Sequence, residues 1–329
     1  MAMDELAQSR RFAVDHYSAA SMFVDDISDI VKPLGRNRYY VRSGIRWACV
    51  KNIMLDKEVL KRCLQADIYK VSPNGNVVPL SGNVPSAKRI IKASLALLTE
   101  DPCFETTIRD SNIGVLCYQN GVYDFRARSF NTYDERPDVY PVIVIQRDFP
   151  VARPPRELME EVHEKLLMST LGDADVVRTY MELIAHATAG EHTEHRWAVM
   201  LGGRNSGKGV LQAINENAFG PYVNTINPND LLRASKGSRQ TYTSGATKRH
   251  LKKYGDHFNA RDSTLMMNMN DIPVPVDSTP TTIVFPYTFM HTDELTDFRR
   301  ADPTLKTTFI TRNDVVDAFT WMVIDAYVK

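Results

Sequence analysis

The stretch that most constrains this chain is RWAVMLGGRNSGKGVLQAINENAF, at residues 196–219. Its first half, Trp197 to Leu201, is a short apolar run of the kind that forms a buried strand. Its second half has apolar side chains at positions 210, 211, 214 and 218, which lie on one face of a helix. A glycine-rich turn between a strand and a helix is the P-loop arrangement, in which backbone N–H groups and the helix N-terminus surround a phosphate. The stretch therefore predicts a phosphate-binding turn, with a plain strand-to-helix connection as the alternative.

The residues expected to bind the phosphates are Gly202, Gly203, Arg204, Asn205, Ser206, Gly207, Lys208, Gly209 and Val210. Within this set, Lys208 is expected to reach the outer phosphates of a nucleotide. The residue after the lysine is usually Ser or Thr, because its hydroxyl ligates Mg²⁺. In this chain that residue is Gly209, which has no hydroxyl.

The bulk properties predict an ordinary globular protein. A chain of 329 residues has room for two domains, since single cores stop growing at about 250–300 residues. Its 40 Lys and Arg residues equal its 40 Asp and Glu residues, so the net charge does not indicate a nucleic-acid partner. The cysteines at 49, 63, 103 and 117 lack zinc-site spacing and suggest the reduced thiols of an intracellular protein. With no long apolar run and no signal-peptide core, we expect a soluble protein with no membrane partner.

Hydrophobic spacing and turn residues divide the chain into three expected regions. These are an α+β N-terminal region at 1–150, a helical collar at 151–194 and an α/β P-loop domain at 195–329. The prolines at 150, 154 and 155 break the pattern and mark the first boundary.

Within the first two regions the pattern predicts alternating helices and hairpins. In chain order these are a helix over 4–33 that Pro33 and Gly35 close, a hairpin within 36–52, and helices over 55–64 and 86–98. A hairpin within 113–125, a strand within 139–149 and helices from 157 to 189 follow. Asn120-Gly121 is the strongest of the hairpin signals. The basic residues of the first hairpin either contact DNA or form a solvated face, and we favour the solvated face. They are Arg36, Arg38, Arg42, Arg46 and Lys51.

A P-loop enzyme that hydrolyses ATP also needs an acidic residue at the end of an apolar strand, which holds Mg²⁺. Between residues 220 and 271 the candidates are Asp230, Asp256 and Asp262. None of them ends an apolar strand, because Asp230 opens a predicted helix and the other two lie in polar turns. No such acidic strand, known as the Walker B element, is recognisable, and the metal ligands stay undefined.

The same interval contains a long basic segment without acidic residues, from Leu231 to Gly255. Basic residues interleaved with glycine and an aromatic side chain suit contact with a phosphate backbone and with bases. The alternative is a solvated surface, which is the commoner meaning of a charge run. The residues proposed to contact DNA are Lys248, Arg249, Lys252 and Lys253.

Residues 263–269, STLMMNM, predict a buried strand that leads into Asn270. An amide at the C-terminal end of a strand next to the P-loop strand can contact a γ-phosphate or its attacking water. The alternative is a strand that ends in a turn, for which Asn-Asp-x-Pro is equally suited. Residues 283–285 predict one more strand, and residues 305–327 a helix that forms a lid or packs on the domain.

Taken in order, these segments resemble the helicase part of the poxvirus-type and giant-virus (nucleocytoplasmic large DNA virus) primase-helicases, the superfamily 3 branch of AAA+ ATPases. The resemblance covers about residues 110–329, and Asn270 matches the family's sensor asparagine. The matching segments are GVYDF (121–125), GGRNSGKG (202–209) with FGPYV (219–223), SGATKRHLKKYGDHFNAR (244–261), NMNDIP (268–273) and ADPTLK (301–306).

The resemblance implies a three-layer AAA+-like domain, hexameric rings, ATP and Mg²⁺ bound between subunits, and translocation on single-stranded or forked DNA. It implies that Lys208 and Asn270 are catalytic, that a separate primase or polymerase is a partner, and that a viral protein acts in the host cytoplasm or nucleus. The chain departs from the family pattern at the missing Walker B segment, at Gly209, at residues 277–282 in place of an arginine pair, and in the lack of a primase domain.

The leading hypothesis is therefore an ATP-dependent DNA helicase subunit of a viral or virus-derived replication system. The second is a catalytically degenerate ring or scaffold protein that binds nucleotide and DNA without hydrolysis. A third, a small-molecule kinase or another P-loop enzyme, is disfavoured because the basic segment and Asn270 would then be coincidences.

Overall fold

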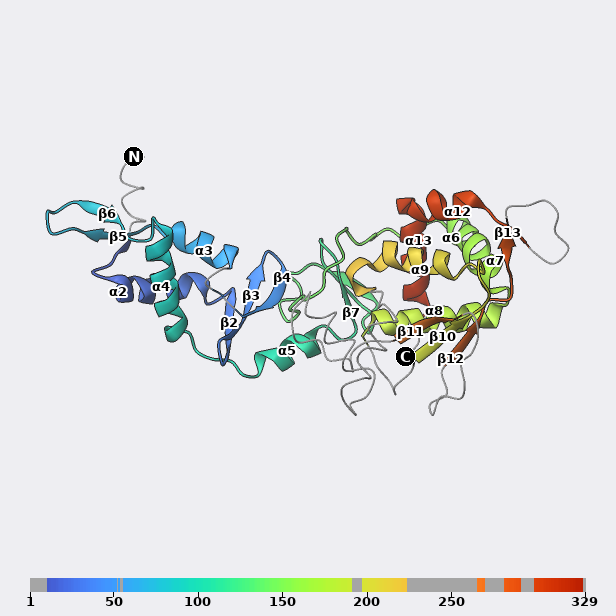
Figure 1. The fold of residues 1–329 in the computed structure, drawn as a ribbon, viewed down its shortest axis with the longest axis horizontal. Coiled ribbons are helices and arrows are strands. Elements are labelled where there is room, and N and C mark those ends of the chain that lie inside the picture. Colours follow the sequence, from blue (N-terminus) through green and yellow to red (C-terminus); the bar gives the residue numbers. More distant parts are fainter. Residues whose placement is uncertain are drawn as a thin grey trace. The chain divides into compact units, whose positions relative to one another are not determined.

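The computed structural model of the chain describes residues 11–51, 53, 56–190, 197–223, 265–269, 281–290 and 299–327 (Figure 1). It is a mixed α/β structure with several small sheets. The described residues form two compact units. The first comprises residues 11–110 with Tyr140–Val142, and the second comprises Ser111–Val139 and the described residues from 143 to 327. The division lies at residue 110, whereas the sequence pattern places a boundary near residue 150.

The first three described helices of the first unit pack around one apolar cluster, and the fourth contributes Phe104 and Ile108 to a second, smaller cluster. In chain order the helices are α2 (His16–Ile27), α3 (Lys57–Leu64), α4 (Val84–Leu97) and α5 (Phe104–Ser111). Phe23, Ile90 and Ile91 are fully buried where α2 and α4 meet. Each of the first three helices begins at a side-chain cap, on Asp15, Asp56 and Asn83, so sequence-local hydrogen bonds set where these helices start.

The predicted first hairpin is confirmed. Strands β2 (Val31–Gly35), β3 (Arg38–Ser43) and β4 (Arg46–Val50) form an antiparallel sheet, and Gly44 has a φ of 59° in the turn between β3 and β4. The prediction of helix as far as residue 33 is wrong, because α2 ends at Ile27 and residues 31–35 pair with β3. Strand β2 is an edge strand, a position that tolerates Pro33. A second small sheet has the order β1 (Arg11–Phe12), β5 (Ile68–Val71), β6 (Val77–Pro79).

The second unit begins with an antiparallel sheet of β7 (Val115–Cys117), β8 (Val122–Asp124) and β9 (Ser129–Asn131). The predicted Asn-Gly hairpin is confirmed between β7 and β8. The predicted strand within 139–149 is wrong, since only an isolated bridge joins Ile145 to Tyr118. Its apolar side chains are buried by packing rather than by strand pairing, as Ile145 and Phe149 belong to the main core cluster.

The helices predicted from 157 to 189 are confirmed, with interruptions. They are α6 (Arg156–Val162), a π-helical turn (His163–Met168), α7 (Ser169–Leu171) and α8 (Ala174–Thr188). Two glycines end helices in the left-handed conformation, Gly172 after α7 with φ 78° and Gly190 after α8 with φ 67°.

A parallel three-stranded sheet in the order β11–β10–β12 lies in the second unit. Its strands are β10 (Trp197–Leu201), β11 (Leu265–Met269) and β12 (Thr281–Val284). The three strands predicted from apolar runs are thus confirmed, and the structure shows that they are neighbours in one sheet. Helix α9 (Lys208–Phe219) follows β10 and ends in a 3₁₀ turn (Gly220–Tyr222).

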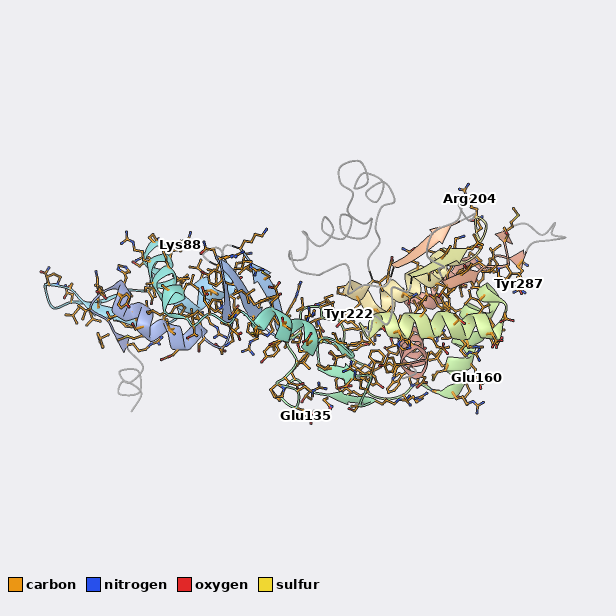
Figure 2. All side chains as sticks on the ribbon, turned by 90° about the horizontal axis from the view of Figure 1, so that it is seen from below. Lys88, Glu135, Glu160, Arg204, Tyr222 and Tyr287 are labelled. Atoms are coloured by element: carbon orange, nitrogen blue, oxygen red, sulfur yellow. The ribbon has the colours of Figure 1, made fainter. Side chains whose placement is uncertain are left out.

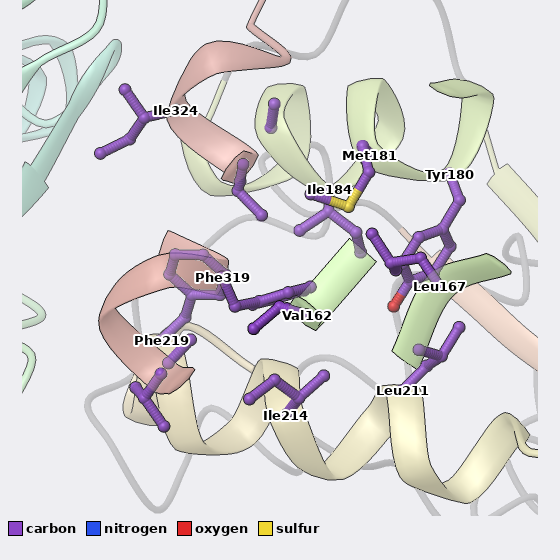
Figure 3. Packing of buried hydrophobic residues seen from close by; sticks show 14 of the residues in the cluster. Val162, Leu167, Tyr180, Met181, Ile184, Leu211, Ile214, Phe219, Phe319 and Ile324 are labelled. Atoms are coloured by element: carbon purple, nitrogen blue, oxygen red, sulfur yellow. The ribbon is translucent and has the colours of Figure 1, made fainter. Parts of the chain in front are cut away.

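The C-terminal part is helical as predicted, although it is divided. It comprises α12 (Pro303–Thr307), a 3₁₀ turn (Phe309–Thr311) and α13 (Asn313–Asp325), preceded by the short strands β13 (Phe289–Met290) and β14 (Arg299–Arg300). Figure 3 shows apolar side chains of α8, α9 and α13 meeting in one interior, among them Ile184, Ile214 and Phe319. Among the described helices, none has the length and apolar character that crossing a bilayer requires.

Candidate phosphate-binding site

The candidate site lies where the parallel sheet leads into α9. Strand β10 is the central strand and pairs in parallel with β11 and with β12. The last residue of β10, Leu201, is paired with Met269 at the end of β11 and with Val284 at the end of β12. The turn at residues 202–207 therefore leaves the sheet at its carboxyl edge, the edge at which open α/β sheets bind their ligands.

The turn has the backbone conformation that its glycines permit. Gly207 has a φ of 91°, and a Cβ there would lie 2.4 Å from Cγ2 of Thr170. A Cβ on Gly202 would lie 2.7 Å from Cβ of Phe285 and 2.9 Å from Oγ of Ser206. Asn205 also has a positive φ, 61°, which asparagine tolerates better than most residues. A side chain larger than hydrogen is therefore excluded at Gly202 and Gly207 by close contacts within the fold.

The other two glycines are open. The nearest atom to a Cβ on Gly203 is Oγ1 of Thr288 at 3.8 Å, and the nearest to a Cβ on Gly209 is Nζ of Lys306 at 4.0 Å. Both glycines are exposed, as are Arg204 and Asn205 between them. Figure 2 shows the side chain of Arg204 pointing outward at the turn. The outer face of the turn is thus accessible to a ligand.

Backbone donors along this face are unused. Among the described residues, no acceptor is hydrogen-bonded to the backbone N–H groups of residues 203–209. Helix α9 starts at Lys208, and Gly207 at its N-cap provides no side-chain acceptor. These N–H groups add to the partial positive charge of the helix N-terminus. A row of free donors at a helix N-terminus is the arrangement that binds phosphate groups.

Lys208 places its ammonium group inside the turn. Its Nζ donates hydrogen bonds to the carbonyl oxygens of Gly202 and Gly203, the latter at 3.0 Å, and to Oγ of Ser206 at 3.1 Å. Partial burial lowers the pKa of Lys208 from its ordinary value. No carboxylate in the described part of the chain forms an ion pair with it, so its charge is balanced only by these neutral oxygens.

The residues present fit the phosphates of ATP better than they fit its metal. Free N–H groups and the Lys208 ammonium suit phosphate oxygens. For Mg²⁺, Gly209 provides no hydroxyl, and the buried hydroxyl of Ser206 already accepts a hydrogen bond from Lys208. The described residues also contain no cluster of three or more His, Cys, Asp or Glu side chains that could hold a metal ion.

Neighbouring segments fix the turn from two sides. The N–H of Phe285 donates to the carbonyl of Leu201 at 2.7 Å, and the N–H of Phe289 donates to the carbonyl of Asn205 at 2.9 Å. On the other side, the side chain of Thr170 in α7 occupies the space that a Cβ of Gly207 would need. Thr170, Phe285 and Phe289 are supporting residues that the sequence reasoning missed, because no motif marks a residue whose role is to pack against a distant turn.

A stacked pair lies beside these supporting segments. The guanidinium of Arg299 lies 3.2 Å from the ring centre of Tyr287, and its Nη1 donates to the carbonyl of Ser169 at 3.1 Å. The ring of Tyr287 also fills the space beside Gly172, where a Cβ would lie 2.6 Å from the tyrosine oxygen. Tyr287, labelled in Figure 2, therefore links the end of α7 to the segment that precedes β13.

Two asparagine amides, the buried one of Asn215 and the more exposed one of Asn217, hold helix α9 to its neighbours. Nδ2 of Asn215 donates to the hydroxyl of Tyr180 in α8 at 2.6 Å. Nδ2 of Asn217 donates to the carbonyl of Ile310 at 2.9 Å. These bonds, made in the second half of α9, attach the helix to α8 and to the 3₁₀ turn at Phe309–Thr311.

The remaining predicted site residues fall outside the described part of the chain. They are Asn270, Lys248, Arg249, Lys252 and Lys253, together with the three acids considered for metal binding. The strand expected to lead to Asn270 is described, and β11 ends at the preceding residue, Met269, beside the end of β10. In the first hairpin, Arg38 pairs with Glu105 at 3.4 Å and Arg42 with Asp29 at 3.1 Å, as expected of a solvated face.

Comparison with known protein families and curated proteins identifies no relative of this chain. The chain matches no model of a known protein family, and a search of curated proteins finds no match. The case for a function therefore depends on the strand, turn and helix at residues 197–219 and on the sheet around them.

Proposed function

We propose that this chain is an ATP-dependent DNA helicase subunit of a viral or virus-derived replication system. The observation that supports this most is the turn at residues 202–209, where free N–H groups and the Lys208 ammonium lie together at the N-terminus of α9. This arrangement suits the triphosphate of ATP, because a row of backbone donors and one cation match its closely spaced negative charges.

The order of the sheet is a second support. Strand β10 lies between β11 and β12, all three are parallel, and β11 ends one residue before Asn270. In the superfamily 3 helicases that the sequence resembles, the sensor asparagine follows the strand beside the P-loop strand. We accordingly assign the second unit to a P-loop fold of the AAA+ type.

The proposed roles follow from chemistry. The N–H groups of the turn and Lys208 bind the phosphates, and Asn270 senses the γ-phosphate. ATP binds with Mg²⁺, which would neutralise charge on the β- and γ-phosphates. Lys248, Arg249, Lys252 and Lys253 contact the DNA backbone, and the chain acts as a homo-oligomeric, hexameric ring.

A second function is favoured by one specific observation at the same site. Gly209 lacks the hydroxyl that ligates Mg²⁺, and the described residues form no acidic metal site. Nucleotide binding without hydrolysis fits this chemistry, which would make the chain a nucleotide- and DNA-binding ring or scaffold protein.

An ATPase assay on the full chain tests the helicase proposal. We expect Mg²⁺-dependent release of phosphate that single-stranded DNA stimulates, and we expect Lys208→Ala to abolish it. Lys92→Ala is the matched control, because Lys92 is an exposed lysine in α4 of the first unit.

The outcomes separate the two functions. Activity that Lys208→Ala leaves intact contradicts the proposed site. ATP binding without turnover, combined with salt-sensitive binding of single-stranded DNA, supports the scaffold function instead. ATP binding with no affinity for DNA at low salt would contradict both and favour another P-loop enzyme.

A further inference from the structure

A second lysine lies beside the phosphate-binding turn, and it comes from a distant part of the sequence. Helix α12 begins at Asp302, whose carboxylate accepts the N–H of Thr304 at 2.8 Å. Leu305 packs against the apolar core of the second unit. The following residue, Lys306, is exposed, and its Nζ lies 4.0 Å from the point that a Cβ of Gly209 would occupy.

Within the described part of the chain, nothing neutralises the charge of Lys306. No carboxylate among the described residues forms an ion pair with it, and it has no hydrogen-bond partner there. Its ammonium lies at the N-terminal end of α9, where the helix already presents partial positive charge. Lys208 adds another cation to the same end. Two cations and a helix N-terminus repel one another unless an anion lies between them.

Lys306 also lies next to Gly209, the position at which the P-loop motif lacks its usual hydroxyl. A P-loop usually has Ser or Thr at the position of Gly209, and that hydroxyl holds the Mg²⁺ that bridges the outer phosphates. In this chain, the atom nearest to the point that a Cβ of Gly209 would occupy is Nζ of Lys306. A positive charge from the protein therefore lies on the side of the turn from which the metal would otherwise be held.

We propose that Lys306 is a second cationic ligand for the outer phosphates of the nucleotide, so that ATP binding depends little on a divalent cation. Lys208 binds the phosphates from within the turn, and Lys306 binds them from the side of Gly209. This inference depends on the nucleotide site proposed above. It adds that two lysines neutralise the negative charge of the outer phosphates.

The test is a calorimetric titration of the full chain with ATP, in EDTA and in Mg²⁺. We expect the wild-type dissociation constant in EDTA to lie within about threefold of the value in Mg²⁺. Lys306→Gln should weaken binding in EDTA by about tenfold, the loss expected for one charged hydrogen bond. Lys306→Arg, which keeps the cation, should retain affinity to within about threefold.

Two controls show where a failure lies. Lys92→Gln removes an exposed lysine of the first unit and should leave the affinity unchanged, and thermal melting verifies that each variant is folded. If Lys208→Ala abolishes binding while Lys306→Gln binds as the wild type does, the role of Lys306 is overturned and the nucleotide site stands. A wild-type affinity that EDTA abolishes also overturns the role of Lys306. A wild-type chain that binds no ATP in either buffer overturns both proposals.

Discussion

A surface ion-pair cluster of the first unit and the two lysines beside the turn of the second unit differ in how their charge is balanced. In the first unit Asp29 pairs with both Arg42 and Arg62, each at 3.1 Å, on an exposed surface. In the second unit Lys208 and Lys306 have no carboxylate partner among the described residues, and both lie at the N-terminus of α9. These arginines of the first unit are neutralised by a carboxylate of the protein. The two lysines beside the free N–H groups have no such carboxylate in the described part of the chain, and a bound anion would neutralise them. In a chain whose net charge is zero, this difference sets the solvated surface apart from the proposed nucleotide site.

The largest expected effect is a loss of stability caused by a change in the shape of the turn, with its charge unchanged. Gly207→Ala should destabilise the second unit by about 3 kcal/mol, because it combines a left-handed φ with a Cβ that collides with Thr170. Chemical denaturation measures this change. Gly209→Ala is the matched control and should alter stability by no more than about 0.5 kcal/mol, since its site is open. Equal effects of the two substitutions would contradict the turn geometry.

The next effect is a loss of ATP affinity when the positive charge of Lys208 is removed. Lys208→Ala should weaken ATP binding by about 100-fold, because charged hydrogen bonds to phosphate are lost. Arg42→Ala, which removes a paired cation of the first unit, should leave the affinity within about twofold of the wild type. Titration with ATP measures both. A loss of affinity in Arg42→Ala as large as that in Lys208→Ala would remove the contrast between the two units.

A third prediction concerns a paired cation inside the second unit. Arg147 bonds Asp317 at 2.6 Å and Thr320 at 2.6 Å, and its Nη2 donates to the carbonyl of Ala218 at the end of α9. Arg147→Ala should lower the free energy of unfolding by about 2 kcal/mol, less than for a fully buried pair because both side chains are partly exposed.

A double-mutant cycle isolates that pair. Burial raises the pKa of Asp317 despite the guanidinium beside it, so the carboxylate is poorly stabilised once Arg147 is gone. Asp317→Asn should therefore recover part of the stability that Arg147→Ala loses. Simple additivity of the two substitutions would show that the pair contributes nothing beyond packing.

The smallest effect is expected for the exposed pairs of the first unit. Arg42→Ala should destabilise the chain by about 0.5 kcal/mol, because the ion pair with Asp29 is exposed and Arg62 still neutralises the same carboxylate. Thermal melting at low and at high salt measures the effect, which screening should reduce. A change comparable to that of Arg147→Ala would mean that the hairpin surface is more than a solvated face.

Local patterns predicted most of the elements around the site. The apolar run at 197–201, the helix after Lys208 and the strand ending at Met269 all form as expected, because each is encoded by side-chain period and by glycine within a short window. The segment at 139–149 failed for the opposite reason. Its Ile145 and Phe149 are buried by packing against the core of the second unit and not by a neighbouring strand.

By itself the sequence determined that a strand, a glycine-rich turn with Gly-Lys and a helix follow one another, since glycine freedom and hydrophobic period are local properties. Only the tertiary structure decided which partners that turn acquires. Thr170 and Phe285 crowd two of its glycines, and Lys306, ninety-seven positions after Gly209 in the chain, lies beside the third. No local pattern specifies contacts at such separations, because they depend on how the helices close around a shared core.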